Sequence, residues 1–347
     1  MNLMRKVLGL TLILTFVSVA LAKDSGTLLV LNKSDNTVSL IDLATRKTVA
    51  VVPTGIGPHE VAVSPDGKTA VIANYGAQTP GSSLTIIDVP GKKALKTIDL
   101  GEYRRPHGIV WLKGKQVVVT AEGNKALLVV DINTGKISNA VVTNQNVSHM
   151  VVVSPRHGRA FVANIGSGSV TVIDLKANER ITDIQTGAGA EGIDISPNEK
   201  EVWVTNRAAN TVSVVDADSL KVTATLPSKD FPIRVKFAPG GKYVLVSNAR
   251  SGDLAIFDSG TKAEIKRVSM EVKANEASST GGRIFSQFGQ SPVPVGILVA
   301  PGLAHAFVAN TNADIVTMID LKTWQIVDRL TAGKEPDGLG YSRLTVR

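Results

Sequence analysis

Residues 148–185 read SHMVVVSPRHGRAFVANIGSGSVTVIDLKANERITDIQ. Four short runs in this stretch are rich in Val, Ile, Ala and Thr, at roughly 149–153, 159–164, 169–174 and 179–184. The segments between the runs contain Pro, which fixes φ, Gly, which supplies positive φ, and Asn, whose side chain bonds nearby backbone. Runs of β-forming residues separated by such turns predict an antiparallel meander of four strands.

The same pattern recurs seven times along the chain. Each copy has an apolar run that ends in Asp, and successive Asp residues are 46, 43, 43, 42, 42 and 62 positions apart. These residues are Asp42, Asp88, Asp131, Asp174, Asp216, Asp258 and Asp320, and we interpret them as turn caps. Four strands in each of seven repeats predict a seven-bladed β-propeller. A parallel β-helix has shorter repeats, and a leucine-rich solenoid has a Leu/Asn frame that this sequence lacks.

The two ends of the repeat region predict how the ring closes. The first repeat has only three strands, at roughly 27–32, 36–42 and 46–52, and a single strand follows Glu335-Pro336-Asp337-Gly338. Pairing of that C-terminal strand with the N-terminal three strands completes a blade and removes an exposed sheet edge. We therefore expect an all-β fold in which residues 23–347 form one seven-bladed propeller of four-stranded antiparallel blades.

The repeat motifs carry a family resemblance. Runs such as Val71-Ile-Ala-Asn-Tyr75 and Thr211-Val-Ser-Val-Val-Asp216 resemble the YVTN family of β-propeller repeats, and the exported single-chain version is similar to YncE-like periplasmic proteins. Related propellers include surface-layer proteins, the haem d1 domain of nitrite reductases, phosphogluconolactonases and a protein associated with quinone-dependent alcohol oxidation. The resemblance thus implies the fold specifically and the activity only weakly.

The N-terminal segment has the features of a signal peptide. Arg5 and Lys6 precede an apolar stretch at 7–21, and Ala20-Leu21-Ala22 offers small residues to a signal peptidase. The stretch is shorter than a membrane anchor of about 20 apolar residues. We expect residues 1–22 to be removed in the periplasm or on secretion, leaving no stable membrane span; an uncleaved anchor is the alternative. No Cys follows the stretch, which excludes a lipoprotein.

Composition excludes several classes of function. The chain has no cysteine, so c-type haem attachment, Cys-ligated zinc, iron–sulfur clusters and thiol nucleophiles are excluded. The formal net charge is +8, or +6 without the signal peptide, a mild excess that favours anionic surfaces without specifying one. An aromatic content of 4 % argues against a base-stacking surface.

Candidate site residues emerge when the seven segments that begin the innermost strands are aligned. These segments are Pro58-His59-Glu60, Pro106-His107-Gly108, Ser148-His149-Met150, Ala190-Glu191-Gly192, Pro232-Ile233-Arg234, Pro294-Val295-Gly296 and Pro336-Asp337-Gly338. Their second positions put Asp337, His59, His107, His149 and Glu191 in five consecutive blades. Imidazole and carboxylate on one rim are the donors that Zn²⁺, Cu²⁺, Fe²⁺ or a haem-like cofactor uses. The alternatives are a polar pocket for a small molecule or peptide, and a solvated rim.

The longest step between repeats marks an insertion. About 20 extra residues lie at 272–294, in the connection between blades six and seven. A long loop in a compact repeat protein is either a lid or partner-binding element, or a tolerated insertion. In the first case Phe285 and Phe288 anchor it, and Arg283 contacts an anionic group.

Further basic residues are expected on the same face as the histidines: Arg104, Arg105, Arg207, Arg234 and Arg250. Lys33, Tyr75 and Glu122 follow second strands and are expected there too. The basic side chains among these residues form either a positive channel mouth or a set of separately solvated charges.

Three functions from different classes follow. The leading hypothesis is a monomeric, non-catalytic binding or scaffold protein that holds a ligand or partner at the channel mouth. The second is a metal- or cofactor-dependent oxidoreductase, or its accessory protein, using His59, His107 and His149. The third is a nucleic-acid or polyanion binder. No Gly-x-Ser-x-Gly elbow, phosphate-binding Gly-rich loop or His-Glu-x-x-His motif is present in the sequence.

Overall fold

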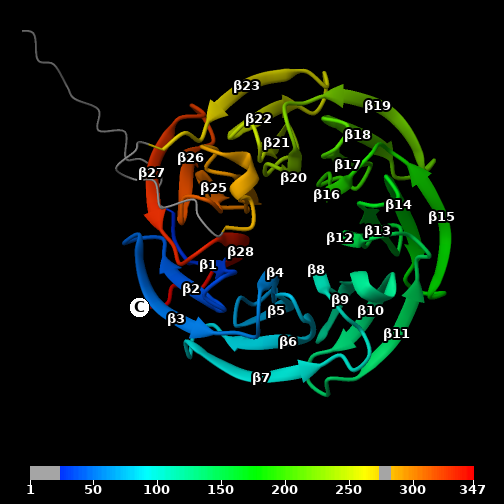
Figure 1. Cartoon of the computed structure of the whole chain (residues 1–347), viewed down its shortest axis with the longest axis horizontal. Coiled ribbons are helices and arrows are strands. Elements are labelled where there is room, and N and C mark those ends of the chain that lie inside the picture. The colour runs from blue at the N-terminus through cyan, green and yellow to red at the C-terminus, as the bar shows by residue number, and fades with distance from the viewer. Residues whose placement is uncertain (1–23, 273–282) are drawn as a thin grey trace, which may run out of the picture.

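The computed structural model describes residues 24–272 and 283–347, and in them seven four-stranded antiparallel sheets form a ring (Figure 1). The predicted seven-bladed propeller is confirmed. The signal peptide predicted at 1–22 lies outside the described residues. Within the described ranges, no helix is long and apolar enough to cross a membrane.

Each blade runs from an innermost strand beside the channel to an outermost strand on the outside of the ring. The innermost strands are β4 (Pro58–Val63), β8 (Pro106–Trp111), β12 (Ser148–Ser154), β16 (Ala190–Ile195), β20 (Pro232–Phe237), β24 (Pro294–Leu298) and β28 (Pro336–Ser342). The second strands are β5 (Thr69–Gly76), β9 (Gln116–Ala121), β13 (Arg159–Asn164), β17 (Glu201–Asn206), β21 (Tyr243–Asn248), β25 (His305–Asn310) and β1 (Thr27–Asn32).

The outer half of each blade follows the same order. The third strands are β6 (Pro80–Asp88), β10 (Ala126–Asp131), β14 (Ser169–Asp174), β18 (Thr211–Asp216), β22 (Asp253–Asp258), β26 (Ile315–Asp320) and β2 (Thr37–Asp42). The outermost strands are β7 (Lys93–Asp99), β11 (Ile137–Val142), β15 (Glu179–Gln185), β19 (Lys221–Pro227), β23 (Glu264–Ser269), β27 (Ile326–Thr331) and β3 (Lys47–Pro53). Two short 3₁₀ turns are η1 (Glu122–Asn124) and η2 (Ser286–Phe288).

The ring closes as the sequence predicts. One sheet has the strand order β28-β1-β2-β3, so the C-terminal strand is the innermost strand of the blade whose other strands begin the chain. Thr27 pairs with Ser342 and Val30 pairs with Leu339. Because this pairing joins the two ends of the chain, the exposed edge of an open sheet is removed.

The repeated polar residues stabilise the blades from within. Each third strand ends at the repeat's Asp, whose carboxylate accepts hydrogen bonds from the following turn, as Asp174 does from the amides of Lys176 and Ala177 at 2.8 and 2.7 Å. The prediction of turn caps is confirmed. The repeated Asn side chains are buried, and Asn164 donates to the Ser169 and Thr171 hydroxyls. Apolar clusters fill the spaces between neighbouring blades, so each blade needs its neighbours for its core.

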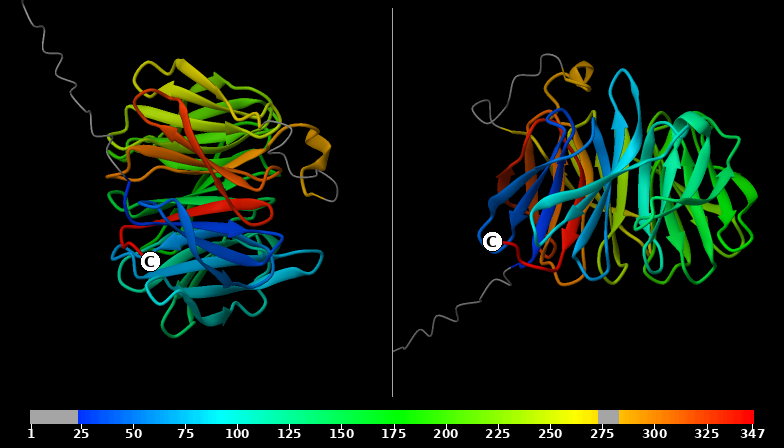
Figure 2. Two further views of the ribbon diagram at one scale, coloured as in Figure 1. Left: turned by 90° about the vertical axis from the view of Figure 1, so that its left-hand side faces the viewer. Right: turned by 90° about the horizontal axis from the view of Figure 1, so that it is seen from below.

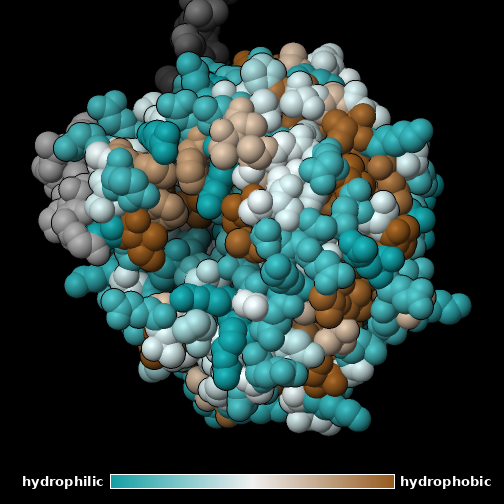
Figure 3. All heavy atoms as spheres, turned by 45° about the vertical axis from the view of Figure 1, so that its right-hand side comes forward, coloured by the Kyte–Doolittle hydropathy of each residue, from teal (hydrophilic) through white to brown (hydrophobic). Residues whose placement is uncertain are grey.

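One face of the ring carries the longer connections. The β5–β6 hairpin and the described part of the β23–β24 loop project from this face (Figure 2). The side of the molecule seen in Figure 3 is mainly hydrophilic, with several separate hydrophobic groups. The candidate site lies at this face, where the channel opens.

Candidate functional site

The innermost strands all begin with a β-bulge, and the bulge positions the candidate side chains. In β4, Pro58 pairs with Asn74 and Val61 pairs with Ile72, so the ladder shifts register around His59 and Glu60. Corresponding shifts occur at the start of the other six innermost strands. A bulge releases its residues from regular pairing and changes the direction of their side chains. The second residue of each segment therefore faces the channel mouth.

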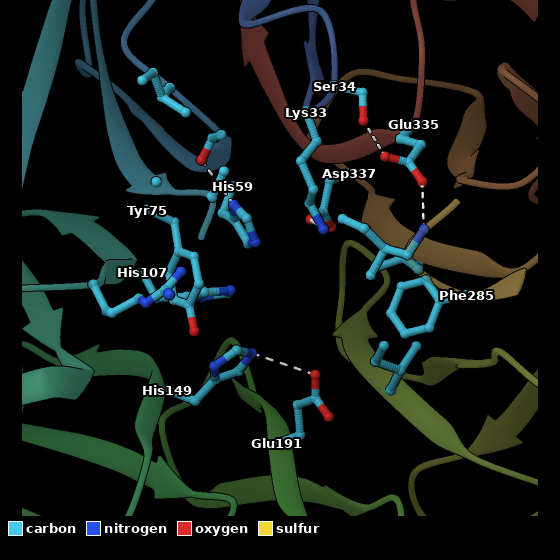
Figure 4. A pocket seen from close by; sticks show the side chains of 18 of the residues that line it. Lys33, Ser34, His59, Tyr75, His107, His149, Glu191, Phe285, Glu335 and Asp337 are labelled. Carbon is cyan, nitrogen blue, oxygen red and sulfur yellow. Dashed lines mark hydrogen bonds and ion pairs between the residues drawn. The ribbon is translucent and has the colours of Figure 1, made fainter. Parts of the chain in front are cut away.

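The five polar residues predicted for the rim do come together in one pocket. Asp337, His59, His107, His149 and Glu191 line a cavity of about 600 Å³, and their side chains surround a common space (Figure 4). The volume is within the range of about 300–1,000 Å³ that is typical of organic-ligand sites. The apolar side of the same cavity is formed by Ile56, Ile233, Ile284, Phe285 and Val295.

Glycine at the third position of these segments lets neighbouring blades approach closely. A Cβ on Gly338 would lie 2.2 Å from the His59 carbonyl oxygen, and one on Gly108 would lie 2.6 Å from the His149 carbonyl oxygen. Gly192 and Gly296 make the corresponding approaches to the next blades. The Pro-x-Gly pattern thus has a packing function that draws the second-position residues into a tight ring.

Three histidines form a continuous row along one wall. The His59 and His107 ring centroids are 5.0 Å apart, those of His107 and His149 are 3.6 Å apart, and Tyr75 stacks on His59 at 4.4 Å. Burial lowers the pKa of His59 to about 3, and Lys33 adds to this effect. Burial and the neighbouring His149 also hold the pKa of His107 well below its usual value. Both rings are therefore neutral at physiological pH.

The hydrogen bond of His59 fixes its tautomer. Its Nδ1 lies 2.8 Å from the Gly57 carbonyl oxygen, which only accepts, so Nδ1 carries the proton. The lone pair is then on Nε2, which faces the pocket (Figure 4). A carbonyl on the far nitrogen is the arrangement that orients histidine ligands in metal proteins.

His149 is held between two carboxylates. Its Nδ1 contacts Glu122 Oε1, and its Nε2 lies 3.3 Å from Glu191 Oε1. Burial opposes the charged ring, but the two carboxylates outweigh it and raise the His149 pKa. Burial likewise opposes the Glu191 carboxylate, yet His149, Arg207 and Arg234 together lower its pKa to about 2.

Arg234 lies inside the channel and joins blades on opposite sides. Its guanidinium donates to Glu60 Oε1 at 2.9 Å and to Glu191 Oε1 at 3.3 Å. Burial raises the pKa of Glu60, and Arg234 opposes that rise. This bridge makes the floor of the pocket.

Lys33 and Asp337 make a buried ion pair at the opposite wall. Lys33 Nζ lies 2.7 Å from Asp337 Oδ2, and both side chains are less than one-tenth exposed. Lys33 is the main reason that the pKa of Asp337 falls to about 2 despite burial. Asp337 Oδ1 is buried without a hydrogen-bond partner among the described residues.

The described part of the inserted loop, from residue 283 onward, forms one side of the mouth. Phe288 packs with Phe231 and is 8 % exposed, and Phe285 lines the pocket. Arg283 makes a bidentate ion pair with Asp314 at 2.6 Å, so its guanidinium fastens the loop to the turn that precedes β26. The two Phe side chains thus pack the loop against the ring, and the anion that Arg283 contacts is a carboxylate of the chain itself. The rest of the insertion, residues 273–282, lies outside the described residues.

The remaining basic residues do not form a continuous positive rim. Arg207 lines the pocket and binds Glu191 at 2.6 Å, and Arg105 lies over the Tyr75 ring. Arg250 lies over the Phe288 ring, and the Arg104 side chain turns back to the Gly101 carbonyl. Neither Arg104 nor Arg250 lines the pocket.

Sequence reasoning missed Glu60 and Glu335. Glu335 accepts hydrogen bonds from Ser34 and from the Ile284 amide, and so ties the loop to the mouth. Glu60 could have been noticed in the sequence. It occupies the third position of its innermost-strand segment, where four of the seven segments have Gly, and Arg234 occupies the same position in another segment. Two opposite charges that replace Gly at channel-facing positions could have been paired.

Two family models match parts of the chain. The family model described as YNCE-like beta-propeller matches residues 15–114, and the one described as Cytochrome D1 heme domain matches residues 113–236. No curated protein matches the chain.

Solved structures share the fold. A chain of Kuenenia stuttgartiensis Hydrazine Synthase has a TM-score of 0.69 at 21% identity, covering 90% of this chain and 99% of that chain. A functionally unknown protein from Desulfotomaculum acetoxidans DSM 771 has a TM-score of 0.74 at 12% identity, covering 92% and 99%. Dihydro-heme d1 dehydrogenase NirN in complex with DHE has a TM-score of 0.62 at 16% identity, covering 88% and 63%. At these identities the likeness shows the fold alone.

Fold and site together define a seven-bladed β-propeller with a buried, charged pocket at one mouth of its channel. Within that class the chain is similar to the YncE-like β-propellers, whose family model matches residues 15–114.

Proposed function

We propose that this chain is an exported, monomeric binding propeller that holds a haem-like cofactor at its channel mouth, in association with redox enzymes. The observation that carries the proposal is the state of His59. Its Nδ1 proton is bound to the Gly57 carbonyl, its pKa is low, and its Nε2 lone pair faces a cavity of about 600 Å³. A neutral, oriented imidazole at the edge of a ligand-sized cavity is suited to bind iron.

The rest of the pocket fits a flat, partly apolar ligand with acidic substituents. Phe285 and Ile284 provide an apolar wall, and Tyr75 stacks against His59. Arg105 lies at the rim over Tyr75 and is placed to bind a carboxylate. When bound, the cofactor would supply electron-transfer chemistry, while the chain's own residues hold it, orient it and restrict water.

The comparisons support the same class of ligand. A Cytochrome D1 heme domain model matches residues 113–236, and one of the similar propellers is a dihydro-heme d1 dehydrogenase in complex with DHE. The fold therefore has relatives in haem chemistry, and the His59 geometry is the local feature that supports such a role here.

The charged side chains of the pocket are paired with one another, and this pairing favours binding over catalysis. Arg234 and Arg207 bind Glu191, and Lys33 binds Asp337, so these charges are committed to holding the pocket in shape. Three of the predicted cations of the mouth, Lys33, Arg207 and Arg234, are bound to carboxylates, which gives less support to the nucleic-acid or polyanion alternative.

The test is a titration of the full-length, tag-free protein with ferric haem b. We expect saturable binding of one equivalent, with a sharpened and shifted Soret band from imidazole ligation. A His59→Ala variant should lose this spectrum, while His157→Ala, which removes a histidine paired with Asp218 away from the pocket, should keep it. A broad, unsaturable spectrum in wild type, or an unchanged spectrum in His59→Ala, would overturn the proposal.

A further inference from the structure

Three donor side chains lie close together beside the pocket, and two of them, His107 and His149, line it. His107 of β8, Glu122 of η1 and His149 of β12 each offer an atom, and these atoms lie within 4.8 Å of one another. The three residues come from two neighbouring blades. This donor set differs from the three histidines that the sequence suggested, because Glu122 takes the place of His59.

Two neighbouring side chains contact the donors Glu122 and His149 in the way that orients metal ligands. Tyr75 Oη donates to Glu122 Oε2 at 2.7 Å, which leaves Glu122 Oε1 directed at His149 Nδ1. On the other side of the ring, His149 Nε2 faces Glu191 Oε1 at 3.3 Å. A carboxylate behind a histidine fixes the ring and raises its basicity, and it is a recurrent partner of metal-bound histidine.

His107 supplies a second, independent indication. Its Nδ1 is buried and has no hydrogen-bond partner among the described residues, and the residue as a whole is 2 % exposed. A buried polar nitrogen without a partner is costly, and it is satisfied when it binds a cation. The ring lies against His149 with centroids 3.6 Å apart, so both imidazoles can reach one ion.

The ligand chemistry selects the kind of ion. Two imidazole nitrogens and one carboxylate oxygen suit divalent transition metals, Zn²⁺ above all, rather than Mg²⁺ or Ca²⁺, which prefer oxygen ligands. Three protein ligands would leave the fourth position of a tetrahedral site free for water or a ligand. Donors of a tetrahedral site with metal–nitrogen distances of about 2.0–2.1 Å are roughly 3.4 Å apart. The three donors already lie within 4.8 Å of one another, and His149 Nδ1 and Glu122 Oε1, which are in direct contact, would move apart to admit the ion.

We propose that His107, Glu122 and His149 bind one divalent transition-metal ion, with Glu191 and Tyr75 as the residues that position the ligands. His149 uses Nδ1 and Glu122 uses Oε1. The site goes beyond the proposed haem-like ligand, because its donors do not include His59. Each proposal can therefore fail without the other.

The experiment equilibrates the full-length, tag-free protein with Zn²⁺ and, in parallel, with Co²⁺. Metal content after gel filtration and calorimetric titration should give one bound equivalent, and Co²⁺ should give the visible absorption of a four-coordinate site. His107→Ala and Glu122→Gln should weaken Zn²⁺ binding by more than about 100-fold, and Tyr75→Phe, which keeps the ring, by about 10–100-fold. The matched controls are His157→Ala, in a turn away from the pocket, and His59→Ala, and both should still bind one equivalent.

Circular dichroism melting identifies any variant that fails to fold, and Tyr75→Phe then remains as the conservative test. Absence of stoichiometric Zn²⁺ in wild type, or wild-type affinity in both Glu122→Gln and Tyr75→Phe, would overturn the proposal. Haem binding that persists alongside either result would leave the proposed function intact.

Discussion

Arg234 of β20 donates a hydrogen bond of 2.9 Å to Glu60 of β4, although 174 positions separate them in the sequence. The two strands lie on different sides of the channel (Figure 1). Because the same guanidinium also reaches Glu191, one buried cation joins three blades beneath the pocket. The pocket floor is thus a structural crosslink of the ring as well as a wall of the site.

Removing this cation should destabilise the ring. Arg234→Ala leaves Glu60 buried without its main partner, and breaking a buried ion pair costs about 3–5 kcal/mol. We expect the urea midpoint to fall accordingly at pH 7, with an unchanged slope. Arg104→Ala, at an exposed arginine on the same face, is the control and should change stability by less than about 0.5 kcal/mol. Equal effects of the two changes would show that the bridge contributes nothing.

The glycine at the closure point should not tolerate a side chain. A Cβ at position 338 would lie 2.2 Å from the His59 carbonyl oxygen, so Gly338→Ala must push β28 and β4 apart. We expect a loss of about 1–3 kcal/mol from overpacking, together with weaker ligand binding at His59. Thermal melting and haem titration measure the two effects. Gly260→Ala, in a turn where the nearest atom is the Asp258 carboxylate oxygen at 3.3 Å, should be nearly neutral.

Stability should fall as the solution is acidified below neutrality, in part because of His59. The pKa of His59 in the folded chain is about 3, below the ordinary value of 6.5. Between these two pH values the unfolded chain therefore binds a proton at His59 that the folded chain does not bind. This contribution is present above pH 6.5 and is lost as the pH falls toward 3. Denaturation of wild type and His59→Gln at pH 8 and pH 5 should show a smaller loss in the variant. The same loss in both would contradict the assignment, and His157→Gln is the control for histidine replacement.

Phe288 should hold the described part of the β23–β24 loop against the ring. Phe288→Ala removes a ring that packs on Phe231 and Phe285, and the lost burial is about 3 kcal/mol or more. Hydrogen exchange at 283–293 should become roughly 100-fold faster, while the innermost strands keep their protection. Ile284→Ala, at a side chain that is 51 % exposed, should leave exchange close to wild type. Uniform loss of protection across the blades would instead indicate a role in global stability.

Much of the fold followed from local patterns. The strand runs and turn residues predicted 149–153 and 159–164 where β12 and β13 occupy Ser148–Ser154 and Arg159–Asn164. The turn after β14 was predictable from Asp174, because its carboxylate caps amides only two and three residues further along the chain. Such features depend on neighbours in sequence, so a single repeat contains the information for them.

The candidate site was predictable as a set of residues but not as a set of contacts. Alignment of the repeats placed His59, His107, His149, Glu191 and Asp337 at one position, and the structure brings them into one pocket. The alignment showed Glu60 and Arg234 as opposite charges at third positions, but it gave no distances between blades, so it did not indicate that Arg234 would be buried between Glu60 and Glu191. Nor did it indicate that Arg283 would pair with Asp314.

The sequence by itself determined the number of blades, the strand order within each blade and the closure by the C-terminal strand. Those properties come from a repeated pattern of β-forming runs and turn residues that acts over a few positions at a time. Only the tertiary structure decided which charges meet, that His59 is neutral with Nε2 open to the pocket, and that Glu122 joins His107 and His149. These features depend on distances between different blades and on burial inside the channel, which exist only once the ring has closed.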